Sequence, residues 1–520
     1  MVSPDRPPHR DPGIGFFDEK DTKEAIEKIA KAKRLTIFTG AGIAADLHVP
    51  NWSNLVSRLL ENLESETYQN DHECHSTVQQ AVDFFHQMPA ASIVDALYDE
   101  KHPLHALNQR NRDIAKILYA SSGDSPVDRT PEDSLAVYVL RLAVAKRLAG
   151  CDVHILTTNY DDMLEQIAGH HEIFSDLGSD GVAVYTNWNH EDDGLARGVP
   201  ISHLHGFIPR TGSAREVVFS EREYIQWDRE SKWRDYLPKR VTGGGLTLFI
   251  GASLRDYNIA AMIRRFSRGE VYALLPVEDE VAHAQLRGKP WLPSSARYAS
   301  LRGLHLGVRV LRPDFYGQVC QFLHEATIPT DLRVPNYSTR LRKWWQSWST
   351  EDQKPQRLNR LVDYSRSLRQ FAINEERQLD RTPHVKAEVW VRDDPDSRRL
   401  RLYASSQNVV LPDAGYWPHS ARIEHMSRYV AVSAFAARQA TEGTVENSHD
   451  GRWTHFLAVP IILPEAPYYE LPVGVMILLL HAPAIEEEVY FGDAESDHMR
   501  ELAVRMKTLG QEFLRPTTSP

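Results

Sequence analysis

The sequence predicts an α/β fold built on a parallel sheet, followed by a second and smaller α+β domain. Over the first two-thirds of the chain, short runs rich in β-branched residues alternate with stretches of helical periodicity. That alternation is typical of a parallel sheet covered by helices on both faces. From about residue 383 onward, strand-like segments come together and helices flank them, which is the α+β pattern.

Each element of the first region follows from its own run of residues. The segments expected to form the parallel sheet are 34–39, 152–157, 182–187, 201–204, 246–250, 271–275 and 308–311. Between the first two, Leu55, Leu59, Leu60 and Leu63 recur at helical spacing, so helices are expected to be inserted there.

The rest of the chain changes character twice. Residues 340–380 are polar with apolar residues at helical spacing, and they predict a connecting helix or helical pair. The expected elements of the last domain are strands at 387–391, 400–404, 454–463 and 474–480 and helices at 427–440 and 495–513. The predicted organisation is a disordered tail (1–13), a first domain (14–328), a helical linker (329–382) and a last domain (383–517).

Composition excludes whole classes of protein. The 520 residues include 60 basic and 71 acidic side chains, a net charge of −11, which argues against broad nucleic-acid binding. Three cysteines cannot build a disulfide framework or a four-thiolate zinc site. The polar N-terminus has no apolar signal core, and no apolar run reaches the ~20 residues of a spanning helix. We therefore expect a cytoplasmic protein without a membrane segment.

Polar or small residues follow four of the expected strands, where open α/β folds place their ligands. These segments are Gly40-Ala41-Gly42, Thr158-Asn159-Tyr160-Asp161, His203-Leu204-His205-Gly206 and Gly251-Ala252-Ser253. Glycines after a strand let a backbone approach a pyrophosphate, although a plain strand–turn–helix is the alternative.

Two of the four segments also have simpler interpretations. Asn159 and Asp161 suit the N-terminal cap of a helix over residues 162–168. His203 and His205, two residues apart, are expected to point to the same side of a strand. A metal pair is the alternative there, but no acidic or thiol partner lies at ligand spacing, so no metal is expected.

Together the four segments resemble the SIR2 family of NAD-consuming enzymes, especially the SIR2-like bacterial NAD hydrolases of anti-phage defence. The resemblance covers about residues 14–328 and extends to Pro50-Asn51-Trp52, which is similar to a variant of the family's Pro-Asp-Phe-Arg loop. It implies a Rossmann-like fold with NAD as the substrate. The implied NAD contacts are phosphate and ribose contacts from Gly40, Ala41, Gly42, Gly251 and Ser253, a carboxamide contact from Asp161, and a nicotinamide cover from Trp52.

The family's catalytic pair matches Asn159 and His205. An amide can orient a water or a ribose hydroxyl without adding charge, and a histidine is a suitable general base near neutral pH. The chain departs from SIR2 deacylases because it lacks the two Cys-x-x-Cys pairs of their zinc module. Ala44 also replaces a family serine. These departures favour hydrolysis of NAD to nicotinamide and ADP-ribose. The alternatives are a protein deacylase or ADP-ribosyltransferase, and a non-catalytic regulator that binds NAD or ADP-ribose.

The last domain resembles a GAF domain. The resemblance rests on residues 456–463, 473–479 and 491–499, together with the helix over 429–440. It implies a sensor for a small molecule or protein trigger, or a ligand-free dimerisation module. With the SIR2 resemblance, it also implies a homo-oligomer whose NAD consumption is regulated through this domain.

Overall fold

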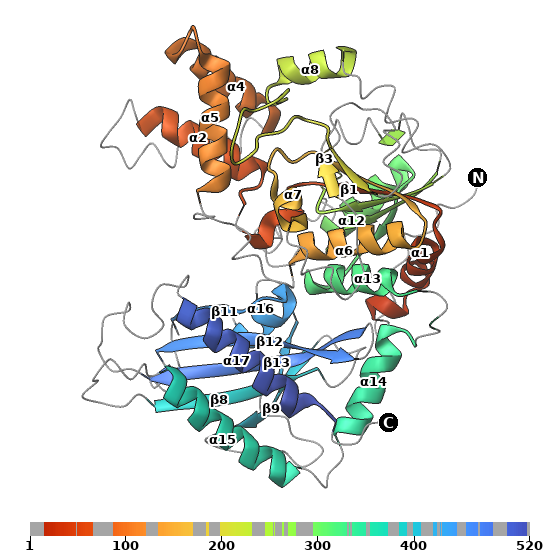
Figure 1. The fold of residues 1–520 in the computed structure, drawn as a ribbon, viewed down its shortest axis with the longest axis vertical. Coiled ribbons are helices and arrows are strands. Elements are labelled where there is room, and N and C mark those ends of the chain that lie inside the picture. The colour runs from red at the N-terminus through yellow and green to blue at the C-terminus, as the bar shows by residue number, and fades with distance from the viewer. Residues whose placement is uncertain are drawn as a thin grey trace. The chain divides into compact units, whose positions relative to one another are not determined.

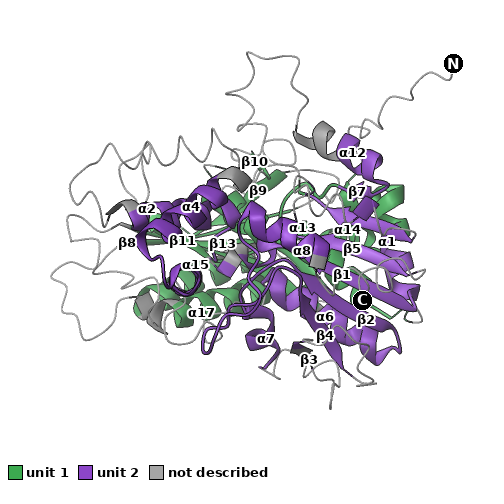
Figure 2. Ribbon diagram, turned by 90° about the horizontal axis from the view of Figure 1, so that it is seen from above, with its two compact units in different colours: residues 1–24, 276–295, 312–520 green, residues 25–275, 296–311 purple. Residues whose placement is uncertain are grey.

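The computed structural model describes most of the chain, and the residues that it describes divide into two compact units (Figure 2). The described residues are 15–47, 49–65, 87–120, 134–169, 184–186, 198–230, 245–252, 254, 263–264, 269–276, 295–329, 332, 335–349, 354–372, 384–392, 399–406, 420–423, 427, 429–444, 454–465, 469–481 and 497–516. The predicted disordered tail lies outside them. Unit 2 contains residues 25–275 and 296–311, and unit 1 contains residues 1–24, 276–295 and 312–520.

Unit 2 contains the parallel sheet that the sequence predicts. Along the sheet, the strands are β3 (Val184–Thr186), β4 (Val199–His203), β2 (Asp152–Thr157), β1 (Arg34–Thr39), β5 (Leu246–Ile250), β6 (Glu270–Leu274) and β7 (Arg309–Leu311). Every neighbouring pair is parallel. The central strands are apolar runs because both faces of the sheet are covered. In one core cluster, the ring centroids of Phe38 and Phe249 are 4.6 Å apart.

Helices surround this sheet and also form a separate insertion. Helices of unit 2 outside the insertion include α1 (Lys20–Lys31, which enters the unit at Ala25), α6 (Leu135–Leu148), α7 (Met163–Ala168) and α12 (Ser295–Leu306, which enters it at Ala296). The insertion consists of α2 (Trp52–Ser65), α4 (Gln87–Lys101) and α5 (Ala106–Tyr119), which pack against one another (Figure 1). Helix α8 (Glu221–Glu230) packs against α4. Leu55, Leu59, Leu60 and Leu63 are buried in the core of this bundle, as their spacing predicts.

Unit 1 is built on an antiparallel sheet. Its order is β10 (Ser420–Arg422), β9 (Arg399–Ser405), β8 (His384–Val391), β13 (Tyr469–His481), β12 (His455–Glu465) and β11 (Thr441–Thr444). Helix α16 (Val430–Ala437) packs with Val475 and Ile477, whereas α17 (Asp497–Leu514) meets Gly474 and Ile461. Because side chains alternate along a strand, these helices cover opposite faces. The predicted α+β arrangement is present, while the resemblance to a GAF domain stays a prediction.

The segment predicted as a linker is part of the packed core of unit 1. It forms α14 (Tyr337–Trp348) and α15 (Lys354–Ala372), a helical pair, and α15 lies along α17 (Figure 1). Trp348 is fully buried. The indole N–H groups of Trp344 and Trp348 donate to the carbonyls of Leu514 and Phe513 at 2.9 and 3.1 Å. These bonds satisfy carbonyls at the end of α17 that have no partner inside the helix.

Two segments that lie far apart in the sequence also pack together in unit 1. Phe16 and Phe17, in a short 3₁₀ helix (Phe16–Asp18), contact the rings of Phe322 and Tyr337. Phe322 lies on α13 (Gly317–Thr327), whose Glu325 pairs with Arg340. The predicted domain limits stay a prediction, but α13 packs within unit 1. Among the described residues, no helix combines the length and the apolar character needed to cross a membrane.

Candidate active site

Four strands of unit 2 end in one row. Along the sheet, His203 of β4 lies beside Thr157 of β2, Thr157 beside Thr39 of β1, and Thr39 beside Ile250 of β5. Three of the segments singled out in the sequence directly follow Thr39, Thr157 and Ile250, and the segment of the two histidines begins at His203 itself. The chain continues from β1 to one side of the sheet and returns to the other side at β5, so the row includes the topological switch point at which open α/β folds bind ligands.

The glycines of the first and fourth segments pack against each other. Gly42 N donates to Gly251 O at 2.9 Å, and Gly40 N donates to Ile250 O at 3.3 Å. A Cβ on Gly42 would lie 2.8 Å from Gly251 Cα, and one on Gly40 would lie 2.9 Å from Ala252 Cα. These glycines therefore let two loops approach closely. Ala41 begins the 3₁₀ helix Ala41–Leu47, and Ser253 lies outside the described residues.

Asn159 is held through its backbone. Its N–H donates to Thr157 Oγ1 at 3.0 Å, and its carbonyl accepts from the ring of His203 at 2.8 Å. The preceding N–H, of Thr158, donates to Thr39 O, which ties this loop to the end of β1. The side chain of Asn159 is half-buried, and its amide forms no hydrogen bond within the described part of the chain.

Asp161 is buried at the start of α7 and accepts from Met163 N at 3.2 Å. Burial raises the pKa of Asp161 to about 6, because a desolvated carboxylate is unfavourable, although the nearby His203 and the Met163 N–H oppose that shift. The residue at the N-cap position, Asp162, makes no capping bond and instead accepts from Tyr119 Oη and Arg210 N. The predicted capping interaction at this helix is therefore made by the side chain of Asp161.

The two histidines have different environments. The expectation that they share one face of a strand is wrong, because β4 ends at His203 and His205 lies in the turn that follows. His203 Nε2 lies 2.9 Å from Glu165 Oε1, whereas His205 Nδ1 lies 3.1 Å from Tyr224 Oη. Among the described residues, no group of three or more metal-ligating side chains is found.

His205 is buried under aromatic rings of α8. Tyr224 and Trp227 contact its ring edge-on at 4.8 and 5.6 Å between centroids. The next residue, Gly206, has a φ of +94°, and a Cβ there would lie 2.3 Å from Glu216 O. Only glycine fits this close approach, which turns the chain out of the sheet directly after His205.

Trp52 begins α2 and is half-buried. Its ring lies 5.0 Å from that of Phe219 and 6.1 Å from that of Tyr160, which stands between Asn159 and Asp161 in the chain. Tyr160 Oη donates to Val218 O at 2.6 Å. The helical insertion is thus packed directly onto the loop that contains Asn159.

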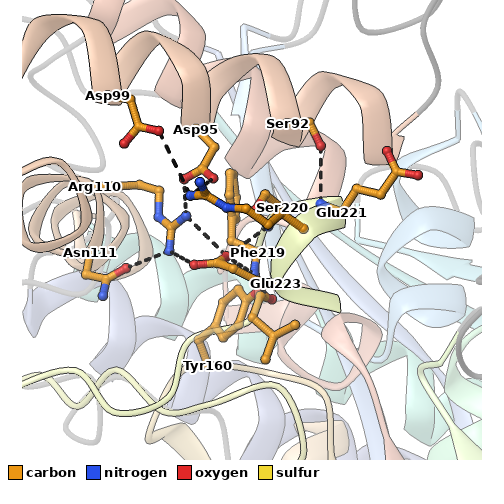
Figure 3. A network of polar contacts seen from close by, with 12 residues as sticks. Ser92, Asp95, Asp99, Arg110, Asn111, Tyr160, Phe219, Ser220, Glu221 and Glu223 are labelled. Carbon is orange, nitrogen blue, oxygen red and sulfur yellow. Dashed lines mark hydrogen bonds and ion pairs between the residues drawn. The ribbon is translucent and has the colours of Figure 1, made fainter. Parts of the chain in front are cut away.

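A buried ion-pair network joins the helical insertion to α8 (Figure 3). Arg110 of α5 is fully buried and binds Glu223 with two nitrogens, at 2.9 and 3.2 Å, and it also pairs with Asp95 of α4. Glu223 Oε2 in turn accepts from the N–H groups of Phe219 and Ser220. Glu223, Tyr224 and Trp227 share one helix, so this network fixes the segment that covers His205.

Sequence reasoning did not find His203's partner Glu165, nor the roles of Arg110, Tyr224 and Trp227. One signal for α8 was present, because Ser220 followed by Glu223 is a capping box, and Glu223 does reach back to Ser220 N at 3.0 Å. Tyr224 and Trp227 stand three residues apart on the helix that this box starts. Glu165 carried no such signal, because it meets His203 across 38 residues.

A curated protein and a solved structure are each similar to part of this chain. The curated protein "Defense-associated sirtuin 2" of Bacillus subtilis is 21% identical over 251 residues, which are 47% of this chain and 21% of that protein. The match therefore spans about one-fifth of the relative's length. A solved structure from the study "Structural Basis for the Mechanism and Regulation of Sir2 Enzymes" is 14% identical, with a TM-score of 0.27, over 61% of this chain and 99% of that chain.

A family model matches a narrower range. It begins inside β2 and includes Asn159, Asp161, His205, Gly251 and Ser253, whereas Gly40 and Trp52 precede it. That model is the SIR2-like domain, and it matches residues 153–289. This part of the chain is therefore similar to the SIR2-like domain.

Proposed function

We propose that this chain hydrolyses NAD to nicotinamide and ADP-ribose. The observation that carries the proposal is the row of four strand ends, because it gathers all four segments at one edge of a parallel sheet. The SIR2-like domain supports the use of NAD, and the similarity to a defence-associated sirtuin supports a role in anti-phage defence through NAD depletion.

The residues present suit the substrate. The close-packed loops of Gly40, Gly42 and Gly251 lie where dinucleotide phosphates bind in folds of this class. Asp161 would hold the nicotinamide carboxamide, and Trp52 would cover the ring. In the reaction, the bond between nicotinamide nitrogen and ribose C1′ breaks, water supplies the new oxygen at C1′, and one proton is released. Asn159 would orient the water, and His205 would accept its proton.

Regulation through the last domain belongs to the same proposal. An enzyme that depletes NAD harms its own cell unless it is controlled. The antiparallel sheet of unit 1, with helices on both faces, suits a GAF-like module that responds to a ligand or partner, or that brings two copies of the chain together.

The proposal is tested by incubating the purified full chain with NAD and separating the products by chromatography. We expect nicotinamide and ADP-ribose in equal amounts without any peptide. O-acetyl-ADP-ribose formed only with an acetylated peptide would instead indicate a deacylase, and unchanged NAD across a panel of nucleotides and phage lysate would indicate a binding protein.

Substitutions then test the site. His205→Ala is expected to lower turnover by about 10²–10⁴-fold, the usual contribution of a positioned acid–base group. Asn159→Ala is expected to lower it by about 10²-fold, because the attacking water loses its orientation. Asn108→Ala and His105→Ala are matched controls, because both residues are exposed and belong to α5 or its N-cap. If the site variants retain the activity of the controls, the assignment of Asn159 and His205 is wrong.

A further inference from the structure

We propose that His203 is held as a doubly protonated imidazolium and that it positions Asn159 for the reaction. This inference rests on the proposed function, because Asn159 is the residue assigned there to orient the attacking water. His203 itself is a positioning residue: it contacts the backbone of Asn159 and not the reacting atoms. Nothing in the SIR2-like match assigns this role.

The hydrogen-bond geometry fits a ring that carries two protons. His203 Nδ1 lies 2.8 Å from the carbonyl oxygen of Asn159, and Nε2 lies 2.9 Å from Glu165 Oε1. A carbonyl oxygen only accepts, and so does an ionised carboxylate. Thr186 Oγ1 also donates to Glu165 Oε1, at 2.9 Å, so this oxygen accepts from a second donor as well. A ring that donates to both acceptors carries a proton on each nitrogen and a positive charge.

The surroundings keep that charge. Burial alone would lower the pKa of His203, but the negative charge of Glu165, the bonds to Glu165 and to the Asn159 carbonyl, and the charge of Asp161 together raise it. Within the described residues, the charged groups facing the ring are Glu165 on α7 and Asp161 on the loop before it. Phe207 covers the ring edge-on at 4.6 Å.

The consequence of this charge concerns the side chain of Asn159. The amide is half-buried and forms no hydrogen bond to a described residue, so its direction depends on how firmly its backbone is held. The backbone is held by Thr157 Oγ1 on the N–H side and by His203 on the carbonyl side. A charged donor is stronger than a neutral one, and small displacements of a positioning group cost much of a reaction's rate.

The first experiment measures the kinetics of full-chain variants. His203→Gln is expected to lower kcat about 10–100-fold with little change in the KM for NAD, because orientation is lost and binding is not. His154→Gln is the matched control: His154 is a buried histidine on β2, bonded through Nε2 to Ser202 Oγ at 2.8 Å. It is expected to keep the kcat of the unaltered chain, and an equal loss in both variants would overturn the positioning role.

The second experiment uses the pH profile. Because the His203 pKa is raised, the imidazolium is present below that pKa and is lost as the pH rises through it, so kcat falls on the alkaline side. Glu165→Gln keeps an acceptor but removes the charge, so it lowers the His203 pKa and moves the alkaline limb to lower pH. A limb that stays in place would contradict the proposal, since a merely structural contact would not move it.

The third experiment observes the ring directly. In full-length protein with ¹⁵N-labelled histidine, the His203 signals are identified by their loss in His203→Gln. Two proton-bound ring nitrogens at pH 7 support the imidazolium, whereas one would overturn it and indicate a neutral ring facing a protonated Glu165. This readout needs no substrate. If the chain leaves NAD unchanged while His203 shows two ring protons, the proposed function fails and the charge state stands.

Discussion

At Gly251 the backbone is left-handed, with a φ of +62°, and the space beside its Cα is already occupied. A Cβ there would lie 2.6 Å from Ile43 N and 2.8 Å from Gly42 C. The residue therefore meets two demands at once, a backbone conformation that disfavours side chains and a close approach to the Gly40–Gly42 loop. Both demands come from the packing of two loops that carry the proposed NAD contacts.

Gly251→Ala is expected to destabilise the protein by more than the conformational cost of about 1–2 kcal/mol, because the new methyl group also displaces the first loop. Gly307→Ala isolates the conformational cost, since Gly307 has a φ of +73° with nothing within 4 Å of a Cβ. Chemical denaturation of both variants gives the difference. Equal losses of stability would mean that the contact between the two loops is loose.

Residue-level prediction from the sequence succeeds where neighbours in the chain define the feature. The close approach of Gly40, Gly42 and Gly251 lies at the strand ends where glycines were noted. The raised pKa of His203 was not predictable, because it depends on Glu165 and Asp161 lying close to the buried His203 ring. The two-residue spacing of His203 and His205 predicted that both lie on one face of a strand, but β4 ends at His203.

Among the elements, α8 is held by the buried ion-pair network of Arg110, Asp95 and Glu223. Arg110 is fully buried, and its loss removes the cation that Glu223 binds and leaves Asp95 with the exposed Arg222. Arg110→Met is expected to cost about 3–5 kcal/mol, the usual effect of removing one partner of a buried pair. NAD turnover is expected to fall as well, because α8 places Tyr224 and Trp227 on His205.

Arg222→Met is the matched control, since Arg222 also pairs with Asp95 but its side chain is 72% exposed. Its expected cost is about 0–1 kcal/mol, and turnover is expected to be unchanged. Thermal unfolding and product analysis of both variants separate the two effects. If Arg110→Met unfolds no more readily than Arg222→Met, the buried network does not fix α8.

Most elements were predictable because their pattern is long or strongly apolar. The parallel sheet is confirmed, and its central strands β1, β2 and β5 have the predicted bounds. The strands β10 and β11 were missed because Ser420–Arg422 and Thr441–Thr444 are short and polar, and they form only by pairing with β9 and β12. The helical pair α14 and α15 was predicted, but not its burial, which arises from contacts with the last helix.

For the molecule as a whole, the packing of α13 determines where unit 1 can be separated from the rest. Arg340 is buried and pairs with Glu325 on α13, and His324 of the same helix accepts from Glu470 N. A fragment that starts at residue 329 lacks both partners, whereas one that starts at residue 312 keeps them. We expect the longer fragment to be more stable, by about 3 kcal/mol or more.

Denaturation of the two fragments checks this, with Glu325→Gln in the longer fragment as the control. That substitution removes the negative charge beside Arg340 but leaves α13 in place. The Glu325→Gln fragment should have a free energy of unfolding between those of the two fragments. Equal stability of both fragments would show that α13 contributes little to unit 1, and the limit predicted at residue 328 would then suit an expression fragment.

Phe16 and Phe17 have a consequence for the order in which the newly made chain folds. They leave the ribosome before Phe322 and Tyr337, which are translated roughly 300 residues later; that interval takes on the order of 15–60 s at ordinary rates of synthesis. Residues 25–275 emerge within that interval. The parallel sheet can therefore form during translation, whereas unit 1 completes its core only after Phe322 and Tyr337 emerge. A nascent chain would have its four strand ends assembled before unit 1 is complete.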